Sequence, residues 1–352
     1  MKEMTKKERV IATLNLQETD RVPIYDLLYN DAVIEYFTGK IPPPGEEGLK
    51  ITCEAISRML DMTRSVTGPS EPGIFIRDDG FVIRRDRWTS WIEERPFKDE
   101  DGAKRWLVES IEKLRNADVK EIADRYLEYF RKILNYIGDT IALLAQTGTG
   151  LDELRHDLGI ELFSYLSVDE PELISEYLDA YTDLQVSFID KIVDKNLSPC
   201  VLTYGDIAIK GRLLHSPEWL RREFLPRLKR LNDAWHRHDI KCLFHSDGYI
   251  MDIIPDLIET GIDGLNPIEV VAGMDLREVK RLYGDSLFIA GGIDVSQLLS
   301  NGTAEEVRKI CKEAIDIGYP GYFIGSTTEL DNGAKLENVL AMVETAWKYQ
   351  LY

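Results

Sequence analysis

Apolar residues in this chain gather in short runs, and each run is followed by apolar positions at helical spacing. Residues 242–244 (Cys-Leu-Phe) form one such run, typical of a buried strand, which ends in the polar segment 245–248 (His-Ser-Asp-Gly). Isoleucine and leucine then recur at helical spacing over 253–258, and Gly261 is placed to end that helix. The next run leads into 263–269 (Asp-Gly-Leu-Asn-Pro-Ile-Glu). Two successive strands are therefore predicted to end in polar residues.

The same alternation extends over most of the sequence. We expect further strands at residues 22–26, 140–145, 200–204, 287–290 and 322–324. Helices are predicted at residues 5–16, 55–66, 103–114, 119–137, 167–194, 217–238, 276–283, from 303 onward and 336–349, with capping-box spacing at Thr5, Ser167 and Thr303. Strands that alternate with helices indicate a parallel sheet. Because no linker is visible, residues 1–352 are predicted to form a single domain, an α/β fold of the (β/α)8 TIM-barrel type with an N-terminal helical segment.

One segment departs from this alternation. Residues 74–77 and 81–84 flank Asp-Asp-Gly at 78–80, a strong β-hairpin signal, and the second arm continues to Trp91. We interpret residues 74–91 as a β-hairpin insertion. Such insertions often cover an active site. The alternative is an exposed hairpin at the side of the domain, and the sequence leaves both open.

Composition narrows the class of protein. The 352 residues are 44% hydrophobic, and 43 basic against 62 acidic residues give a net charge of −19. Such a chain repels phosphate backbones, so nucleic acid is not an expected partner. The four cysteines form no CxxC pair, the N-terminus lacks a signal-peptide pattern, and no apolar run reaches the roughly 20 residues of a membrane span. We expect a soluble cytoplasmic protein without a membrane partner.

Polar residues at the ends of the predicted strands are the candidates for chemistry, because in parallel α/β proteins sites are built at the carboxyl ends of the strands. From these positions we predict Tyr204, Asp206 and Asp247 as catalytic residues. The predicted substrate-binding residues are Tyr25, Gln146, Asn266 and Ser326.

An imidazole and several carboxylates converge in this set. His245, Asp247 and Glu269, with Asp206 in the same cluster, suit Zn²⁺ or another divalent ion. The alternative is an acid/base site in which crowded carboxylates raise one another's pKa. Asp247 has a further alternative, since its side chain can turn outward and close the Asp-Gly turn with Gly248.

Several motifs resemble the uroporphyrinogen decarboxylase superfamily. They are His-Ser-Asp-Gly at 245–248, Asp-Gly-Leu-Asn-Pro at 263–267, Ala-Gly-Met-Asp at 272–275 and Gly-Gly-Ile-Asp at 291–294. Arg-Val-Pro at 21–23 is similar to the start of that family. The resemblance is strongest from Leu202 to Val343, and it implies a (β/α)8 barrel with its site at the C-terminal rim.

Two branches of the superfamily differ in their binding residues. True uroporphyrinogen decarboxylases carry an arginine-rich segment after the first strand, whereas residues 25–30 here contain no arginine. Decarboxylation of uroporphyrinogen is therefore not expected. The chain is similar to the corrinoid-dependent methyltransferases, whose thiol-methylating members hold zinc with His-x-Cys and a later cysteine. Here Asp247 and the segment 326–329 (Ser-Thr-Thr-Glu) occupy those places, and oxygen ligands suit an ether or alcohol oxygen better than a thiol.

The resemblance thus implies an O-demethylase component. It would transfer a methyl group from a methyl ether, typically a methoxylated aromatic, to the Co(I) of a separate corrinoid-binding protein, with zinc at His245 and Asp247 and with Glu269 or Asp206 completing the set. Tyr204 or Tyr25 would supply a proton or orient the ring. The alternatives are a metal-free lyase with Asp206 as general acid, a methylcobalamin-dependent methyltransferase with another acceptor, and a non-catalytic corrinoid binder.

Overall fold

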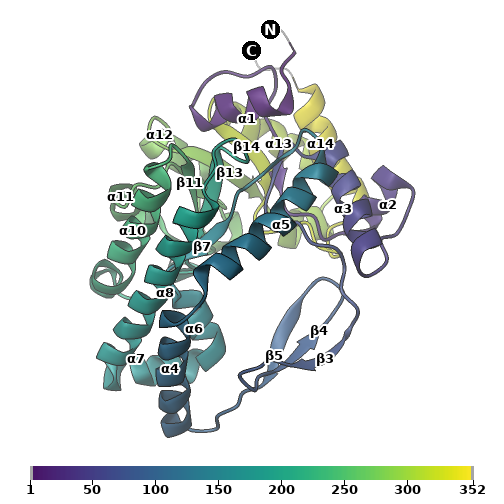
Figure 1. The fold of residues 1–352 in the computed structure, drawn as a ribbon. Helices are drawn as coiled ribbons and strands as arrows, with labels where there is room; N and C mark the ends of the chain where they lie inside the picture. Colours follow the sequence, from purple (N-terminus) through teal and green to yellow (C-terminus); the bar gives the residue numbers. More distant parts are fainter. Residues whose placement is uncertain (1–2, 350–352) are drawn as a thin grey trace.

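Parallel strands enclosed by helices make up most of the molecule, and a small antiparallel sheet stands apart from them (Figure 1). The structure is a computed structural model that describes residues 3–349. The two ends of the described chain lie close together at one side of the molecule (Figure 1).

The main sheet contains six parallel strands in the order β14-β13-β12-β11-β8-β7. Their bounds are Gln146–Gly148 for β7, Cys200–Tyr204 for β8, Lys241–His245 for β11, Gly264–Asn266 for β12, Phe288–Ile293 for β13 and Tyr322–Ser326 for β14. A second parallel sheet has the order β1-β2-β6, with β1 at Tyr25–Asp26, β2 at Met62–Thr63 and β6 at Ile141–Ala142. The predicted parallel α/β arrangement is confirmed.

The two parallel sheets approach each other at both ends. Residues 141–148 contain both β6 and β7, and an isolated parallel bridge joins Ile24 to Ile324. There the Ile324 N–H donates to the Pro23 carbonyl at 3.0 Å. At this end isolated bridges, not a ladder, join the two sheets, and at the other end the chain itself runs from β6 to β7. A continuously hydrogen-bonded closed barrel is therefore not detected among residues 3–349.

Helices cover the outside of the strands (Figure 1). The α-helices are α1 Lys6–Leu14, α2 Asp31–Thr38, α3 Glu46–Met59, α4 Glu100–Arg115, α5 Val119–Ile137, α6 Leu151–Leu158, α7 Ile160–Asp169, α8 Pro171–Ile192, α9 Pro217–Trp219, α10 Leu225–His236, α11 Ile254–Glu259, α12 Leu276–Tyr283, α13 Ala304–Gly318 and α14 Leu336–Lys348. Shorter turns are η1 Leu220–Phe224, η2 Met251–Ile253, η3 Val270–Ala272 and η4 Val295–Leu299. A two-stranded ribbon, β9 Ala208–Ile209 with β10 Arg212–Leu213, follows β8.

Successive residues of the strands point to opposite faces, as the two-residue period of a strand requires. Leu202 and Leu243 belong to a small apolar cluster that also contains Tyr25, whereas Val201 and Phe244 pack into the larger cluster that includes the helices. These four side chains on β8 and β11 are fully buried. This packing fixes the register of β8 and β11, so the residues at their carboxyl ends are held at defined positions.

Two helix predictions are wrong. Residues 55–66 were expected to form one helix, but α3 ends at Met59 and the extended Leu60 leads into the buried strand β2. Ser167 was expected to cap a helix, but it lies inside α7 and donates to the Phe163 carbonyl. The following helix, α8, begins at Pro171, whose missing N–H suits the first helical position. The capping boxes at Thr5 and Thr303 are confirmed.

The predicted hairpin is confirmed by the antiparallel pairing of β3 (Gly73–Ile76) with β4 (Val82–Arg85). A third strand, β5 (Ser90–Glu94), extends it into the sheet that stands apart in Figure 1. Arg87 forms an ion pair with Asp31 at 2.8 Å, which ties the sheet to the start of α2. That the segment is an insertion stays a prediction.

No helix within residues 3–349 is both long enough and apolar enough to cross a membrane.

Candidate functional site

Three neighbouring strands bring the predicted site residues to one edge. The register pairs His245 with Tyr204 on one side and with Asn266 on the other. Each of these residues is the last of its strand, so β8, β11 and β12 all deliver a polar side chain at the same level. The predicted convergence of these strand ends is what the structure shows.

His245, Asp206 and Asp247 form a group whose possible ligand atoms all lie within 4.8 Å of one another. The His245 Nε2 atom is 3.9 Å from Asp206 Oδ1 and 3.9 Å from Asp247 Oδ1. Asp247 Oδ1 is buried and, among residues 3–349, has no hydrogen-bond partner. A buried carboxylate oxygen without a donor is uncommon in folded proteins and calls for an explanation.

Asn266 determines which nitrogen of His245 faces the carboxylates. The Asn266 side-chain amide donates to the Ala290 carbonyl at 3.2 Å, so its oxygen points to His245 Nδ1 at 2.8 Å. Nδ1 must then carry the proton, which leaves the Nε2 lone pair directed toward Asp206 and Asp247. Burial, together with the positive charge of Arg64, lowers the pKa of His245 to about 4, so the ring is neutral at pH 7.

The two carboxylates repel each other and are held together by the fold. Asp206 accepts the Asp247 N–H at 3.1 Å, which places the two acids side by side. Burial and the charges of Asp206 and Glu269 raise the pKa of Asp247 to about 7. A neutral imidazole nitrogen beside two crowded carboxylates is the environment that a divalent cation relieves.

These residues fit zinc. One imidazole nitrogen and two carboxylate oxygens are donors that zinc accepts, and the unpartnered Asp247 Oδ1 is the atom that a cation would satisfy. The Asn266 contact to Nδ1 is the outer hydrogen bond that ligating histidines usually make. No thiol belongs to the group in the described part of the chain, because the free cysteines are buried elsewhere, at Cys53, Cys200, Cys242 and Cys311.

Glu269, the third predicted ligand, lies outside this group. Its carboxylate accepts the Gly248 N–H at 2.6 Å, and its charge acts on Asp247. Gly248 has φ +90, so the loop after Asp247 takes a turn that a glycine permits. The geometry thus gives Glu269 a part in shaping the loop 247–248, and its role as a ligand stays a prediction.

Tyr204 and Gln146 both make contacts within the protein. The Tyr204 hydroxyl donates to Glu153 on α6, and burial beside that carboxylate raises the pKa of the phenol far above its usual range. The exposed Gln146 amide donates to the Ser65 hydroxyl. Tyr204 therefore stays protonated at neutral pH and can donate a hydrogen bond.

Ser326 and Tyr25 lie deeper. Ser326 donates both its hydroxyl and its N–H to Asp26, at 2.7 and 2.8 Å, so both of its donors are used within the protein. The Tyr25 side chain is buried in the small apolar cluster, and its hydroxyl has no partner among the described residues. Of this pair, Tyr25 is the one with a free polar atom.

A cavity of about 570 Å³ opens onto the two carboxylates. Its polar lining includes Arg95, Asp152 and Arg155 together with Asp206 and Asp247, and its apolar lining comes from Ile160, Ala208, Ile209 and Leu214. Arg155 pairs with Asp152 at 2.5 Å and donates to the Asp206 carbonyl at 2.7 Å. Burial and the charge of Asp206 raise the pKa of Asp152 to about 6. A cavity of this volume suits a small molecule.

Four residues near this site were not predicted from the sequence: Arg64, Asp152, Glu153 and Arg155. Asp152, Glu153 and Arg155 lie on α6, a helix that was not expected. Arg64 directly follows β2, and the assignment of 55–66 to a helix hid this strand end. The available signal was Leu60-Asp61-Met62-Thr63, where Asp61 interrupts the apolar run and a β-branched residue follows.

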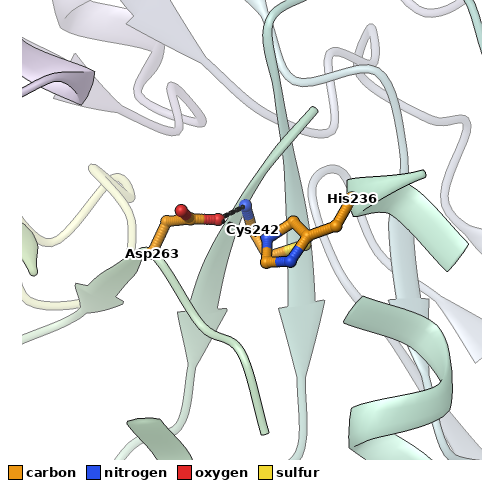
Figure 2. A group of neighbouring side chains, drawn as sticks. All are labelled: His236, Cys242 and Asp263. Atoms are coloured by element: carbon orange, nitrogen blue, oxygen red, sulfur yellow. Dashed lines mark hydrogen bonds and ion pairs between the residues drawn. The ribbon is translucent and has the colours of Figure 1, made fainter. Parts of the chain in front are cut away.

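A second group with histidine, cysteine and aspartate lies at the opposite end of β11 (Figure 2). His236 Nε2 is 2.7 Å from Asp263 Oδ2, which also accepts the Cys242 N–H at 2.8 Å. Lys241 donates to the other oxygen, Oδ1, at 2.8 Å. Burial opposes ionisation, but these three donors hold the pKa of Asp263 below its usual range. Because both oxygens are used, this group is a structural hydrogen-bond cluster.

Comparisons with known proteins are consistent with this fold. The sequence model of the family described as Uroporphyrinogen decarboxylase (URO-D) matches residues 101–349. The methylcobamide:CoM methyltransferase MtbA of Methanosarcina acetivorans is 24% identical over 360 aligned positions, which cover 99% of this chain and 100% of that protein. A methylated-thiol–coenzyme M methyltransferase of Methanosarcina mazei is 27% identical over 190 residues, 53% of this chain.

The coverage of these relatives differs. The match to the methylated-thiol enzyme spans 48% of that protein, about half of its length. A solved structure described as a methyltransferase from Methanosarcina mazei superimposes with a TM-score of 0.73 at 19% identity, covering 99% of both chains. At that identity the superposition shows a shared fold over the whole chain.

Proposed function

Because the chain belongs to the uroporphyrinogen decarboxylase family, we propose that it is a corrinoid-dependent methyltransferase. The methyl group moves from a methyl ether, typically a methoxylated aromatic, to the Co(I) of a separate corrinoid-binding protein. Both curated relatives are named as methyltransferases, and one of them aligns over its full length. Their names support the methyltransferase class, and the choice of an ether rests on the ligand set at His245.

The ligand set is the single observation that carries the proposal. His245 Nε2 faces two carboxylates, one oxygen of which has no donor, and no cysteine lies among them in residues 3–349. His245, Asp206 and Asp247 would hold zinc, with Glu269 as a further predicted ligand. When bound, zinc would act as a Lewis acid that stabilises negative charge on the oxygen losing its methyl group. Nitrogen and oxygen ligands favour such a hard oxygen over a soft thiolate sulfur.

The residues around the ligand group orient its side chains and shape the cavity. Asn266 holds the His245 ring in one tautomer, and the Asp247 N–H holds the Asp206 carboxylate at the cavity wall. Tyr204 keeps its proton and donates a hydrogen bond to Glu153, so a hydrogen bond from Tyr204 to substrate requires that contact to be exchanged. The apolar side of the cavity, formed by Ile160, Ala208, Ile209 and Leu214, offers a surface for a ring or a hydrocarbon chain. Positioning a methyl group within attack distance of cobalt requires the partner protein to dock over this rim.

A second candidate is methyl transfer from a methylated corrinoid to a thiol acceptor. The names of both relatives favour it, since each includes coenzyme M. The two candidates use the same metal site and differ in the atom that loses or gains the methyl group. A third candidate, a metal-free lyase with Asp206 as general acid, is separated from both by its independence of metal.

The test combines metal analysis with a spectroscopic assay. We expect about one zinc per chain, and we expect the visible spectrum of a Co(I) corrinoid protein to change to that of methyl-Co(III) when methoxybenzenes are supplied. The panel also contains methanol, methylamines and methyl thiols. If only thiols or amines exchange methyl groups, the ether proposal is wrong. Full activity without metal would exclude the Lewis-acid role, and ordinary turnover of uroporphyrinogen would place the chain in the decarboxylase branch.

A further inference from the structure

Arg64 is a buried arginine without a partner. It follows β2 at the rim, its exposed fraction is 8%, and no hydrogen bond or ion pair of its guanidinium is present among residues 3–349. A guanidinium carries five N–H donors and is always charged. Leaving such a group buried and unpaired is strongly unfavourable. A protein that retains it in the free state has a donor group prepared for something that binds later.

The other two buried arginines show how this fold normally treats the group. Arg9, 4% exposed, pairs with Asp20 and Asp61 at 2.7 Å each. Arg227, 6% exposed, pairs with Asp179 and Glu223 and also donates to Ser175. Both are saturated by carboxylates on neighbouring elements. Of these three buried arginines, only Arg64 has no hydrogen-bond or ion-pair partner for its guanidinium. Burial by itself therefore does not explain the missing partner.

The carboxylates near Arg64 do not pair with it. Its charge acts on Asp26, Asp247 and Glu329, yet none of them comes within ion-pair distance. Asp26 is held by three donors: the Ser326 N–H and hydroxyl and the Leu27 N–H. The acids thus surround the guanidinium without neutralising it directly.

A second unpartnered donor lies in the same region. The Tyr25 hydroxyl is buried, with the residue 3% exposed, and it lacks a hydrogen-bond partner in the described chain. The charge of Arg64 acts on Tyr25 and also on His245 and Asp247. A guanidinium and a phenol hydroxyl therefore offer free donors beside the candidate metal group. Tyr25 lies on β1 and Arg64 directly follows β2, the strand paired with β1, so the two free donors are neighbours. Neighbouring free donors of this kind can recognise an oxyanion.

We propose that Arg64, assisted by the Tyr25 hydroxyl, binds the acid group of an anionic substrate. The group is a carboxylate or sulfonate on a short molecule whose other end places the methyl-exchanging atom at His245 and Asp247. A single guanidinium can pair with one negatively charged group. The several carboxylates around it would repel further negative charges, so a substrate with many acid groups is disfavoured. This inference rests on the proposed function, because it names the class of substrate for the same site.

Equilibrium binding tests the inference without turnover. The zinc-loaded full chain is titrated by calorimetry with 3-methoxybenzoate and its uncharged analogue methoxybenzene, and with 2-mercaptoethanesulfonate and its uncharged analogue 2-mercaptoethanol. We expect each anion to bind more tightly than its analogue.

In Arg64→Met we expect the anions to lose affinity on the order of 30-fold or more, and the uncharged compounds to be unaffected. In Arg64→Lys we expect a smaller loss, because the charge stays and the fork is removed. The two pairs distinguish a carboxylate from a sulfonate.

Thermal unfolding provides a control that a merely structural arginine would fail. Without ligand, Arg64→Met should keep or raise the Tm, since it removes an unpaired buried charge. Arg227→Met should lower the Tm and leave anion affinity unchanged, and Arg227→Lys replaces it if the first variant does not fold. Three outcomes would overturn the proposal: a lower Tm for Arg64→Met, equal binding of the anions and their uncharged analogues by the wild type, or equal losses of affinity for anions and analogues in Arg64→Met. Anion binding through Arg64 without any methyl transfer would instead reject the proposed function alone.

Discussion

The two ends of β11 carry groups of nearly the same composition and opposite character. At its carboxyl end, His245 Nε2 faces Asp206 and Asp247 across 3.9 Å, and one carboxylate oxygen has no donor. At the other end, both oxygens of Asp263 accept hydrogen bonds at 2.7–2.8 Å, from His236, Lys241 and the Cys242 N–H. Figure 2 shows His236 and Cys242 beside Asp263. The two groups differ in whether their carboxylate oxygens keep lone pairs that no hydrogen-bond donor uses. A histidine and carboxylates make a cation site only where neighbouring donors have left the oxygens unsatisfied.

The largest expected effect separates the two histidines. We expect His245→Ala to lower methyl-transfer turnover by about 100-fold or more and to remove zinc, because it takes away the nitrogen ligand. His236→Ala, at the opposite end of the same strand, should retain zinc and activity. Elemental analysis and the corrinoid spectral assay measure both. Equal losses in the two variants would mean that both histidines, or neither, hold the metal.

The next effect concerns the residue that orients His245. Asn266→Ala removes the acceptor that holds Nδ1 protonated, so we expect zinc affinity to fall by about 10- to 100-fold. Competition with a chromogenic chelator measures the affinity. Gln146→Ala, a change at the exposed first residue of β7 in the same sheet, is the matched control and should leave zinc affinity unchanged. Unchanged zinc affinity in Asn266→Ala would show that the tautomer is set by another contact.

The structural group should respond in stability rather than in activity. Asp263→Asn replaces a carboxylate that accepts three hydrogen bonds with an amide that can accept only through its one oxygen. We expect a loss of about 1–2 kcal/mol in the free energy of unfolding, with zinc content unchanged. Urea denaturation with and without zinc provides the measurement. If Asp263→Asn lost zinc and kept its stability, the assignment of the two groups would be reversed.

The smallest effect is the pH dependence of that stabilisation. The pKa of Asp263 is lowered in the folded state, so its contribution is present above the unfolded pKa of about 4 and is lost as pH falls through the folded value. The stability difference between the wild type and Asp263→Asn should therefore be larger at pH 6 than below about pH 4. Denaturation curves across this range test it. A difference that grows toward acid pH would contradict the hydrogen-bond arrangement.

Much of the site was predictable because strand ends have fixed positions. His245, Asn266 and Tyr204 end three adjacent strands, and short apolar runs in the sequence located all three. Asp206 and Asp247 follow those strands by two residues and were found for the same reason. Glu269 was selected by the same logic, but its carboxylate bonds to Gly248 instead of joining the group. A strand end predicts the neighbourhood of a side chain but not its hydrogen-bond partner.

Other features could not be predicted because they depend on residues far apart in the chain. Ser326 was predicted to bind substrate, which stays a prediction, but the sequence did not indicate that its hydroxyl donates to Asp26, 300 residues away. Arg64 was hidden because β2 has only two residues, too few to show a strand period. The fold of a two-residue strand is decided by its neighbours β1 and β6, which pair with it on either side.

By itself, the sequence determined the alternation of strands and helices, the family motifs and the edge where polar side chains gather. These features are local, since they depend on periodicity and on residue type at the ends of strands. Only the tertiary structure decided which of two similar groups keeps free lone pairs and which of three buried arginines stays bare. Hydrogen-bond saturation depends on every donor that packs nearby, and packing brings together residues that no sequence spacing relates.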